Sequence, residues 1–356
     1  MMIKQGTLKE ISRQTGVAFS TCAAILRADT SCFAGLKVKQ RVLATARELN
    51  YRPNPIARSL RTRKSNTIGL ILPHMIFSSR AIDMELIENL AWQKGYHLFI
   101  GYSQNDVSKE EALLSDFVDR YVDGIIIILG HPSFKGPYLK SLISTTFPLV
   151  AVNYFKKRSL PTVSTDFYRG GQMAARYLLK LNHKRVNVIA ADTNYPSIEQ
   201  RLRGFREVFQ EAGLKSEGIF ILEKSTNKVV PLEKLVIAGY QTARKVLSQP
   251  KKPTAIFAGN DEIGLGVIKA ALDLGIKVPE GLSVIGFDDS PAATFSPISL
   301  TTIRQPREEI SKKAVEMLLT LIEQKSMRGK ETKSELKTIW LKPKLIIRSS
   351  TGPAKS

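Results

Sequence analysis

Cysteine is scarce in this sequence, with only Cys22 and Cys32 among 356 residues. The two stand in neither a metal-ligand nor a redox spacing, which argues against a zinc site, a dithiol centre and a disulfide framework. Cys22 lies at an apolar position of a predicted helix, where we expect a small packed side chain. No metal and no cofactor is expected.

Long hydrophobic runs are missing as well. The longest aliphatic run, Ile125 to Leu129, is far shorter than the roughly 20 residues that span a bilayer, and it predicts a buried strand. No apolar stretch of signal-peptide length follows the N-terminus. We therefore expect a cytoplasmic protein.

Catalytic motifs are not found either. No nucleophile elbow, phosphate-binding loop, dinucleotide glycine fingerprint or zinc spacing occurs, so the sequence predicts that the protein is not an enzyme. The scattered histidines are His74, His97, His131 and His183, the last at a predicted helix end.

Acidic residues are fewer than basic ones, with 32 Asp and Glu against 53 Lys and Arg and a formal net charge of +21. Residues 1–65 alone hold 13 basic and three acidic residues, a net charge of +10. Such a dense basic segment is typical of a module that binds a polyanion. On charge alone, a solvated basic face or a disordered tail remains an alternative.

The first part of the chain predicts three short helices. Thr7 and Glu10 have the spacing of a capping box, and Gly16 ends the first helix. A second helix is predicted over Ala18–Leu26 and a third over Val38–Asn50. A helix, a tight glycine turn and a second helix make a helix-turn-helix, although the same pattern occurs in helical bundles.

Residues 52–66 have the composition of a linker. Pro53 and Pro55 stop the preceding helix, and polar and basic residues follow. Within the linker, Asn54–Arg61 has a helical pattern that is too short to be stable by itself.

From Thr67 onward, strands alternate with amphipathic helices such as Asp83–Lys94 and Ile263–Leu274. This alternation predicts parallel sheets covered by helices on both faces, arranged as two lobes. The predicted strands are Ile68–Leu72, His97–Gly101, Gly124–Leu129, Leu149–Val152, Val186–Ala190, Ile219–Leu222, Ala255–Ala258 and Val284–Phe287.

Three segments, Leu8–Val17, Leu49–Thr62 and Thr67–Pro73, resemble the first helix and turn, the hinge and the first core strand of the lactose-repressor/galactose-repressor (LacI/GalR) family. Further matches follow in the family's order along nearly the whole chain. They are Val122–Ile126, Arg201–Phe205, Ala255–Asp261, Val284–Asp289 and Leu300–Pro306.

The resemblance implies an all-α helix-turn-helix head and an α/β, two-lobed, periplasmic-binding-protein-like core with doubly wound parallel sheets. The implied domains are a head over 1–52, a hinge helix and linker over 53–66, an effector-binding and dimerisation core over 67–348, and a tail over 349–356. It also implies a homodimer that docks two heads on a pseudo-palindromic DNA operator as a transcription regulator, normally a repressor.

Ten residues match positions that contact DNA in the family. On the second helix, Phe19, Ser20 and Ala24 are expected to face base edges, and Thr7, Thr21 and Arg27 to contact phosphates. In the hinge, the matching positions are Asn54, Ala57, Arg58 and Leu60. Leu60 is expected to wedge between base pairs from the minor groove, and simple packing within a linker helix is the alternative.

The head departs from the family pattern at two positions. Ala18 replaces a Ser that caps the second helix, a loss of about 1 kcal/mol. Ala24 replaces an Arg that can bind guanine, which removes about 1–3 kcal/mol of discrimination. The loop Asp29–Lys37 is also about two residues longer than usual, by comparison with the family. We therefore expect a different operator sequence.

Family ligand positions in the core match Arg201, Asn260 and Asp288, a donor and acceptor set that suits a sugar-like or nucleoside-like effector. Each has a simpler alternative: a surface salt bridge for Arg201, a helix cap for Asn260, and a turn or cap for Asp288. The wall of the first lobe departs from the pattern, so specificity is assigned to Phe77, Arg80 and Asn153, with Lys234 as a further candidate.

The resemblance leaves the effector's identity open, and equally whether it releases or tightens DNA binding. Two other functions compete with regulation. A solute-binding receptor shares the two-lobed core but needs a secretion signal and has no basic head. A nonspecific DNA-compacting protein has no need of an effector cleft.

Overall fold

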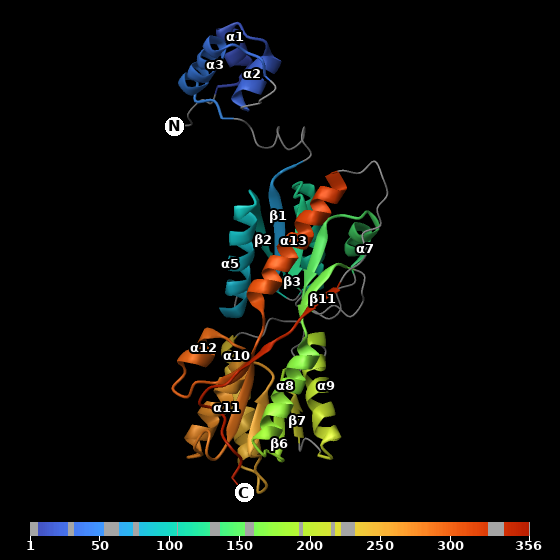
Figure 1. The fold of residues 1–356 in the computed structure, drawn as a ribbon, viewed down its shortest axis with the longest axis vertical. Helices are drawn as coiled ribbons and strands as arrows, with labels where there is room; N and C mark the ends of the chain where they lie inside the picture. The colour runs from blue at the N-terminus through green and yellow to red at the C-terminus, as the bar shows by residue number, and fades with distance from the viewer. Residues whose placement is uncertain are drawn as a thin grey trace. The chain divides into compact units, whose positions relative to one another are not determined.

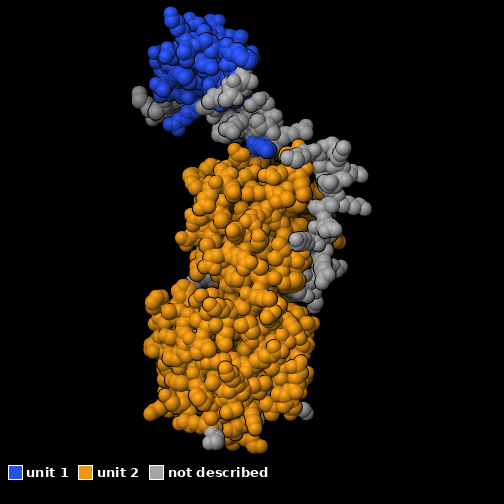
Figure 2. All heavy atoms as spheres, viewed as in Figure 1, with its two compact units in different colours: residues 1–65 blue, residues 66–356 orange. Residues whose placement is uncertain are grey.

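The computed structural model describes residues 6–27, 32–52, 64–73, 78–104, 106–128, 136–153, 160–191, 195–214, 218–221, 232–326 and 338–355. The chain divides into two compact units, Met1–Ser65 and Asn66–Ser356 (Figure 2). Each unit is described by itself. None of the described helices is long and apolar enough to cross a membrane.

Three helices form the first unit: α1 (Leu8–Thr15), α2 (Phe19–Leu26) and α3 (Leu36–Glu48). They surround a small core centred on Ile11, Cys22 and Val42, all fully buried. Both hydrogen bonds of the predicted capping box are present at the start of α1. The predicted helices and the packed role of Cys22 are therefore confirmed, and α3 begins two residues earlier than expected.

Gly16 ends α1 in the left-handed conformation, with a φ of 64°, which glycine adopts without steric cost. This turn allows α2 to pack back across α1 and α3. The described head is thus a folded helical unit, and the alternative of a disordered basic tail is wrong for this part of the chain.

Two sheets form the second unit (Figure 1). The sheet of the first lobe has the order β11-β5-β4-β3-β1-β2, and its described pairings are all parallel. Its strands are β1 (Thr67–Leu72), β2 (His97–Tyr102), β3 (Gly124–Ile128), β4 (Leu149–Val152), β5 (Thr162–Thr165) and β11 (Thr338–Leu341).

The sheet of the second lobe has the order β12-β10-β9-β8-β6-β7, with β12 antiparallel at its edge. Its strands are β6 (Val186–Ala190), β7 (Gly218–Ile221), β8 (Ala255–Ala258), β9 (Ser283–Asp288), β10 (Thr301–Arg304) and β12 (Lys344–Ile346). All eight predicted strands are present. Four further strands, β5, β10, β11 and β12, were not predicted.

Helices cover both faces of each sheet, which confirms the doubly wound fold. In the first lobe, α5 (Ser78–Gln93) and α13 (Arg307–Ser326) pack on one face, and α6 (Val107–Asp119) and α7 (Pro137–Ser144) on the other. In the second lobe, the two pairs are α8 (Phe167–Lys180) with α9 (Pro196–Glu211), and α10 (Leu232–Leu247) with α11 (Asp261–Asp273). The short α12 (Pro291–Phe295) follows β9.

The chain passes between the lobes three times: from β5 to α8, from β10 to α13, and from β11 to β12. Two of these crossings are joined by a hydrogen bond of 2.9 Å, which Thr165 Oγ1 donates to Gln305 Oε1. Because α13 belongs to the first lobe although β10 belongs to the second, the lobes are connected by three chain segments rather than by one linker.

The last described residues pack against the second lobe. The Ser350 hydroxyl donates to the Val284 carbonyl at 2.6 Å, and Gly352 accepts from a ring nitrogen of the buried His183 at 2.9 Å. The segment predicted as a tail is therefore part of the lobe, and His183 anchors it.

Candidate functional site

The exposed end of α2 is the first candidate site. Cys22 and Ile25 face the core of the head, whereas Ser20 is exposed and Phe19 is 56% exposed. A large aromatic side chain left in solvent at the start of a helix is available for contact with a partner. Thr21 and Ala24 are half-buried on the same helix.

Thr7 and Arg27 lie at helix ends. The hydroxyl of Thr7 accepts from the Glu10 amide at 3.2 Å, and Glu10 accepts from the Thr7 amide at 2.7 Å. Capping thus occupies this hydroxyl, and its contact with phosphate stays a prediction. Arg27 is exposed at the end of α2.

Ala18 caps α2 without a side-chain hydrogen bond, as its methyl group requires. The predicted hinge residues Asn54, Ala57, Arg58 and Leu60 lie outside the described residues.

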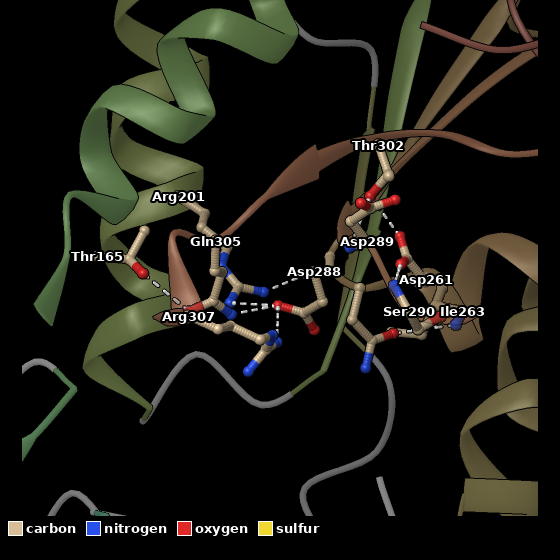
Figure 3. A network of polar contacts seen from close by, with 12 residues as sticks. Thr165, Arg201, Asp261, Ile263, Asp288, Asp289, Ser290, Thr302, Gln305 and Arg307 are labelled. Atoms are coloured by element: carbon tan, nitrogen blue, oxygen red, sulfur yellow. Dashed lines mark hydrogen bonds and ion pairs between the residues drawn. The ribbon is translucent and has the colours of Figure 1, made fainter. Parts of the chain in front are cut away.

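The second candidate site lies where strands of the second lobe end. In α9, Arg201 is buried, donates from Nη1 to the Gly259 carbonyl at 2.5 Å and lies 3.4 Å from Asp288 through Nη2 (Figure 3). Its guanidinium stacks 3.8 Å from the Phe287 ring centroid and 4.9 Å from that of Phe167. The alternative of a surface salt bridge is therefore wrong for Arg201.

One carboxylate oxygen of Asp288 contacts several hydrogen-bond donors. Its Oδ1 accepts from Gln305 Nε2 at 2.5 Å and lies 4.0 Å from Arg307 Nη2, in addition to the Arg201 contact (Figure 3). Its backbone has a φ of 114°, a conformation that costs free energy and is concentrated at ligand sites. The cap of α12 falls at Ser290 instead, so Asp288 is not a helix cap.

Asn260 caps α11, because its side-chain oxygen accepts from the Ile263 amide at 3.0 Å. The capping interpretation is confirmed, and a contact with ligand stays a prediction for this residue.

The first lobe contributes a charged wall. Arg80 on α5 bonds Asp83 at 3.0 Å, and Arg307 at the start of α13 bonds both oxygens of Asp83 at 2.9 and 3.1 Å. Asn153 at the end of β4 is 9% exposed, and its amide oxygen, turned toward Arg80, accepts from the two terminal nitrogens at 3.1 and 3.2 Å. Phe77 lies outside the described residues, and Lys234 is exposed on α10.

Two further carboxyl groups are buried beside this network. Burial, together with the charge of Asp288, raises the pKa of Asp261 well above its usual value, although the Thr302 hydroxyl and the Ser290 amide bond to it. Burial, and again the charge of Asp288, raises the pKa of Glu262 to about 7. Desolvation also lowers the pKa of Arg201.

The structure thus brings together Arg80, Asn153, Arg201 and Asp288 through residues that sequence reasoning missed. Gln305 lies within the matched segment Leu300–Pro306 and could have been found there. Asp83 and Arg307 are 224 positions apart, and nothing in the sequence pairs them.

Residues 175–351 match the family model of the periplasmic binding protein-like domain. The HTH-type transcriptional repressor PurR of Haemophilus influenzae is 29% identical over 344 residues, which cover 97% of this chain and 98% of that protein. The chain is thus similar to LacI/GalR regulators along nearly its whole length.

Solved structures agree with the LacI/GalR fold. The lac repressor dimer bound to operator and the anti-inducer ONPF aligns with a TM-score of 0.81 and 21% identity over 98% of this chain and 100% of that one. The transcriptional regulator CelR in complex with cellobiose aligns with a TM-score of 0.69 and 20% identity over 97% and 100%. The predicted two-lobed core and helix-turn-helix head are confirmed, and the similar proteins are regulators rather than enzymes.

Proposed function

We propose that this protein is a cytoplasmic, homodimeric repressor that binds a pseudo-palindromic operator and is controlled by a small polar effector held between its lobes. The observation that carries the proposal is that one chain contains both a basic helix-turn-helix with an exposed Phe19 and a core with the Arg201–Asp288 network. A solute-binding receptor does not need a basic helix-turn-helix, and a DNA-compacting protein does not need an effector-binding network in its core.

DNA recognition is assigned to the exposed part of α2. Phe19, Ser20 and Ala24 are proposed to face base edges in the major groove, where a helix fits. Contacts with phosphates, which fix position without reading sequence, are proposed for Thr7, Thr21 and Arg27. Two heads are needed because one short helix reads only a half-site.

An exposed apolar edge supports the homodimer. β2 is the edge strand of the first lobe, and it leaves Phe99, Ile100 and Tyr102 exposed by 42%, 40% and 37%. Trp92 on the neighbouring α5 is 61% exposed. An edge strand with this composition promotes association unless a partner covers it, and a second copy of the chain is the proposed cover.

The effector is proposed to lie against Asp288, Arg201, Asn260, Arg80 and Asn153. A carboxylate accepts from hydroxyl groups, and a fixed guanidinium donates to ring or hydroxyl oxygens. A sugar-like or nucleoside-like molecule offers both kinds of group.

Control of DNA binding is proposed to pass through the lobes. Arg307 contacts Asp83 of the first lobe and Asp288 of the second, so a ligand that competes for Asp288 changes the contacts between lobes. The change shifts the spacing of the paired hinges, and a coupling of about 1–3 kcal/mol gives a useful switch.

The experiment is footprinting of the protein on its own upstream DNA, with and without hits from a thermal-shift screen of sugars and nucleosides. We expect a protected palindrome whose occupancy changes with a hit. Uniform protection of all DNA, or a verified ligand without effect on occupancy, contradicts the proposal.

A hinge variant tests the wedge. Leu60→Ala should weaken binding to the palindrome while largely sparing the salt-sensitive binding to random DNA. Equal loss of both would show that Leu60 does not insert between base pairs.

A further inference from the structure

A single carboxylate in the first lobe serves two guanidinium groups. Asp83 accepts from Arg80 at 3.0 Å and from Arg307 at 2.9 and 3.1 Å. The side chains of Asp83 and Arg307 are each 9% exposed, whereas that of Arg80 is 21% exposed. One negative charge thus stands between two positive charges, and Arg80 is the more accessible of the two arginines.

The neighbouring carboxylates are directed to other groups. Asp288 accepts from Gln305, contacts Arg201 at 3.4 Å and lies 4.0 Å from Arg307, so it does not approach Arg307 as closely as Asp83 does. Asp261 accepts from the hydroxyl of Thr302 at 2.5 Å. The high pKa values of Asp261 and Glu262, which burial causes, further reduce the negative charge near the guanidiniums.

The second partner of Arg80 is neutral. With the Asn153 amide assigned so that its oxygen faces Arg80, that oxygen accepts from both terminal nitrogens of the guanidinium at 3.1 and 3.2 Å. Asn153 itself has a φ of 80°, a left-handed conformation that Asn tolerates better than most residues. An amide oxygen satisfies hydrogen bonds but does not neutralise the charge of an arginine. The planar fork of a guanidinium matches the geometry of a carboxylate or a phosphate, and either of these anions neutralises the charge of the arginine.

We propose that the effector carries an anionic group, a carboxylate or a phosphate, and that Arg80 and Asn153 bind this group on the first lobe. The hydroxyl groups of the same molecule then face Asp288 and Arg201 on the second lobe. This inference rests on the proposed function, because it names the chemical class of the effector that the proposed function places at these residues. It makes Arg80 the residue that separates acidic sugars from neutral ones.

The test compares matched pairs by isothermal titration of the full-length protein: glucose with glucuronate, galactose with galacturonate, and ribose with ribose 5-phosphate. We expect at least one acidic member to bind about tenfold to hundredfold more tightly than its neutral parent, the range of one charge-assisted contact. The uronate and phosphate pairs distinguish the two anions.

Variants of Arg80 then test whether this residue causes the preference for the acidic ligand. Arg80→Gln should reduce the ratio of affinities for the acid and the neutral parent to near one, and Arg80→Lys, which keeps the charge but loses the fork, should give an intermediate ratio. Arg120→Gln is the matched control, because Arg120 lies on the surface with its side chain 59% exposed. Circular dichroism verifies that each variant is folded.

The inference is overturned if the neutral members bind as tightly as the acids, if no member of the panel binds, or if Arg80→Gln leaves the ratio unchanged. Footprinting of the ligand-free protein is measured in parallel. If the protein protects a palindrome but prefers a neutral sugar, only the inference of an anionic effector is rejected. If the protein shows no sequence-specific protection, the proposed function itself is rejected.

Discussion

Replacing Asp83 by asparagine should destabilise the first lobe more than replacing Arg307, the arginine that bonds it most closely. In Asp83→Asn, two guanidiniums lose their shared carboxylate, and one of them is 9% exposed. Arg307 keeps the longer contact with Asp288 at 4.0 Å but loses its close counterion, and breaking a buried pair in this way costs about 3–5 kcal/mol. In Arg307→Met, Asp83 keeps the Arg80 contact at 3.0 Å, so the cost should be smaller, about 1–2 kcal/mol.

Urea unfolding followed by tryptophan fluorescence measures this difference. The chain has two tryptophans, and both Trp92 on α5 and Trp340 on β11 belong to the first lobe. With a slope of about 1–3 kcal/mol per molar urea, Asp83→Asn should lower the midpoint by about 1 M or more. The protein concentration is held constant because a dimer's stability depends on it.

Asp116→Asn is the matched control. Asp116 pairs with Arg120 on the surface of α6, where the two side chains are 48% and 59% exposed, so the midpoint should hardly move. Equal losses in Asp83→Asn and Arg307→Met, or a larger loss in the latter, would refute the shared-carboxylate reasoning.

Three further predictions concern other parts of the chain. Ala18→Ser should add a side-chain cap to α2 and stabilise the head by about 1 kcal/mol, seen as slower amide exchange in α2; unchanged exchange would contradict it. Burial raises the pKa of Glu110 to about 7, so the protonated carboxyl group favours the folded state. The free energy of unfolding should therefore fall as pH rises from about 4.5 to above 7. Glu110→Gln should reduce this pH dependence in urea unfolding and raise the free energy of unfolding at pH 8. Ile100→Lys on the β2 edge should convert the dimer to monomer in light scattering, whereas Lys109→Glu on α6 should not.

Much of the fold follows from local patterns. Runs such as Ile125–Ile128 are apolar throughout because parallel strands are covered on both faces, and a capping box needs only Thr7 and Glu10 to be recognised. The strands that escaped prediction are short, with three or four residues each. Two of them, Thr162–Thr165 and Thr301–Arg304, are also rich in hydroxyl residues, so their burial depends on neighbouring strands rather than on their own sequence.

The site was only partly predictable for the same physical reason. Arg201 and Asp288 lie in segments with a recognisable pattern, and the structure places them in contact. The Asp83–Arg307 pair arises because α13 returns to the first lobe and packs beside α5. A contact made by chain crossing leaves no periodicity or spacing for sequence reasoning to use.

The three crossings between the lobes also constrain the order in which the protein can fold during synthesis. The first lobe begins at β1 but takes its helix α13 and its edge strand β11 from the last fifty residues of the chain. Until those residues leave the ribosome, the face of the sheet that contains Leu70, Ile126 and Val150 lacks α13, one of the two helices that bury it. A nascent or truncated chain that stops after β10 therefore exposes apolar surface in the lobe that was made first. We expect such chains to recruit chaperones and to be degraded, so nonsense mutations late in the coding sequence should be as damaging as early ones.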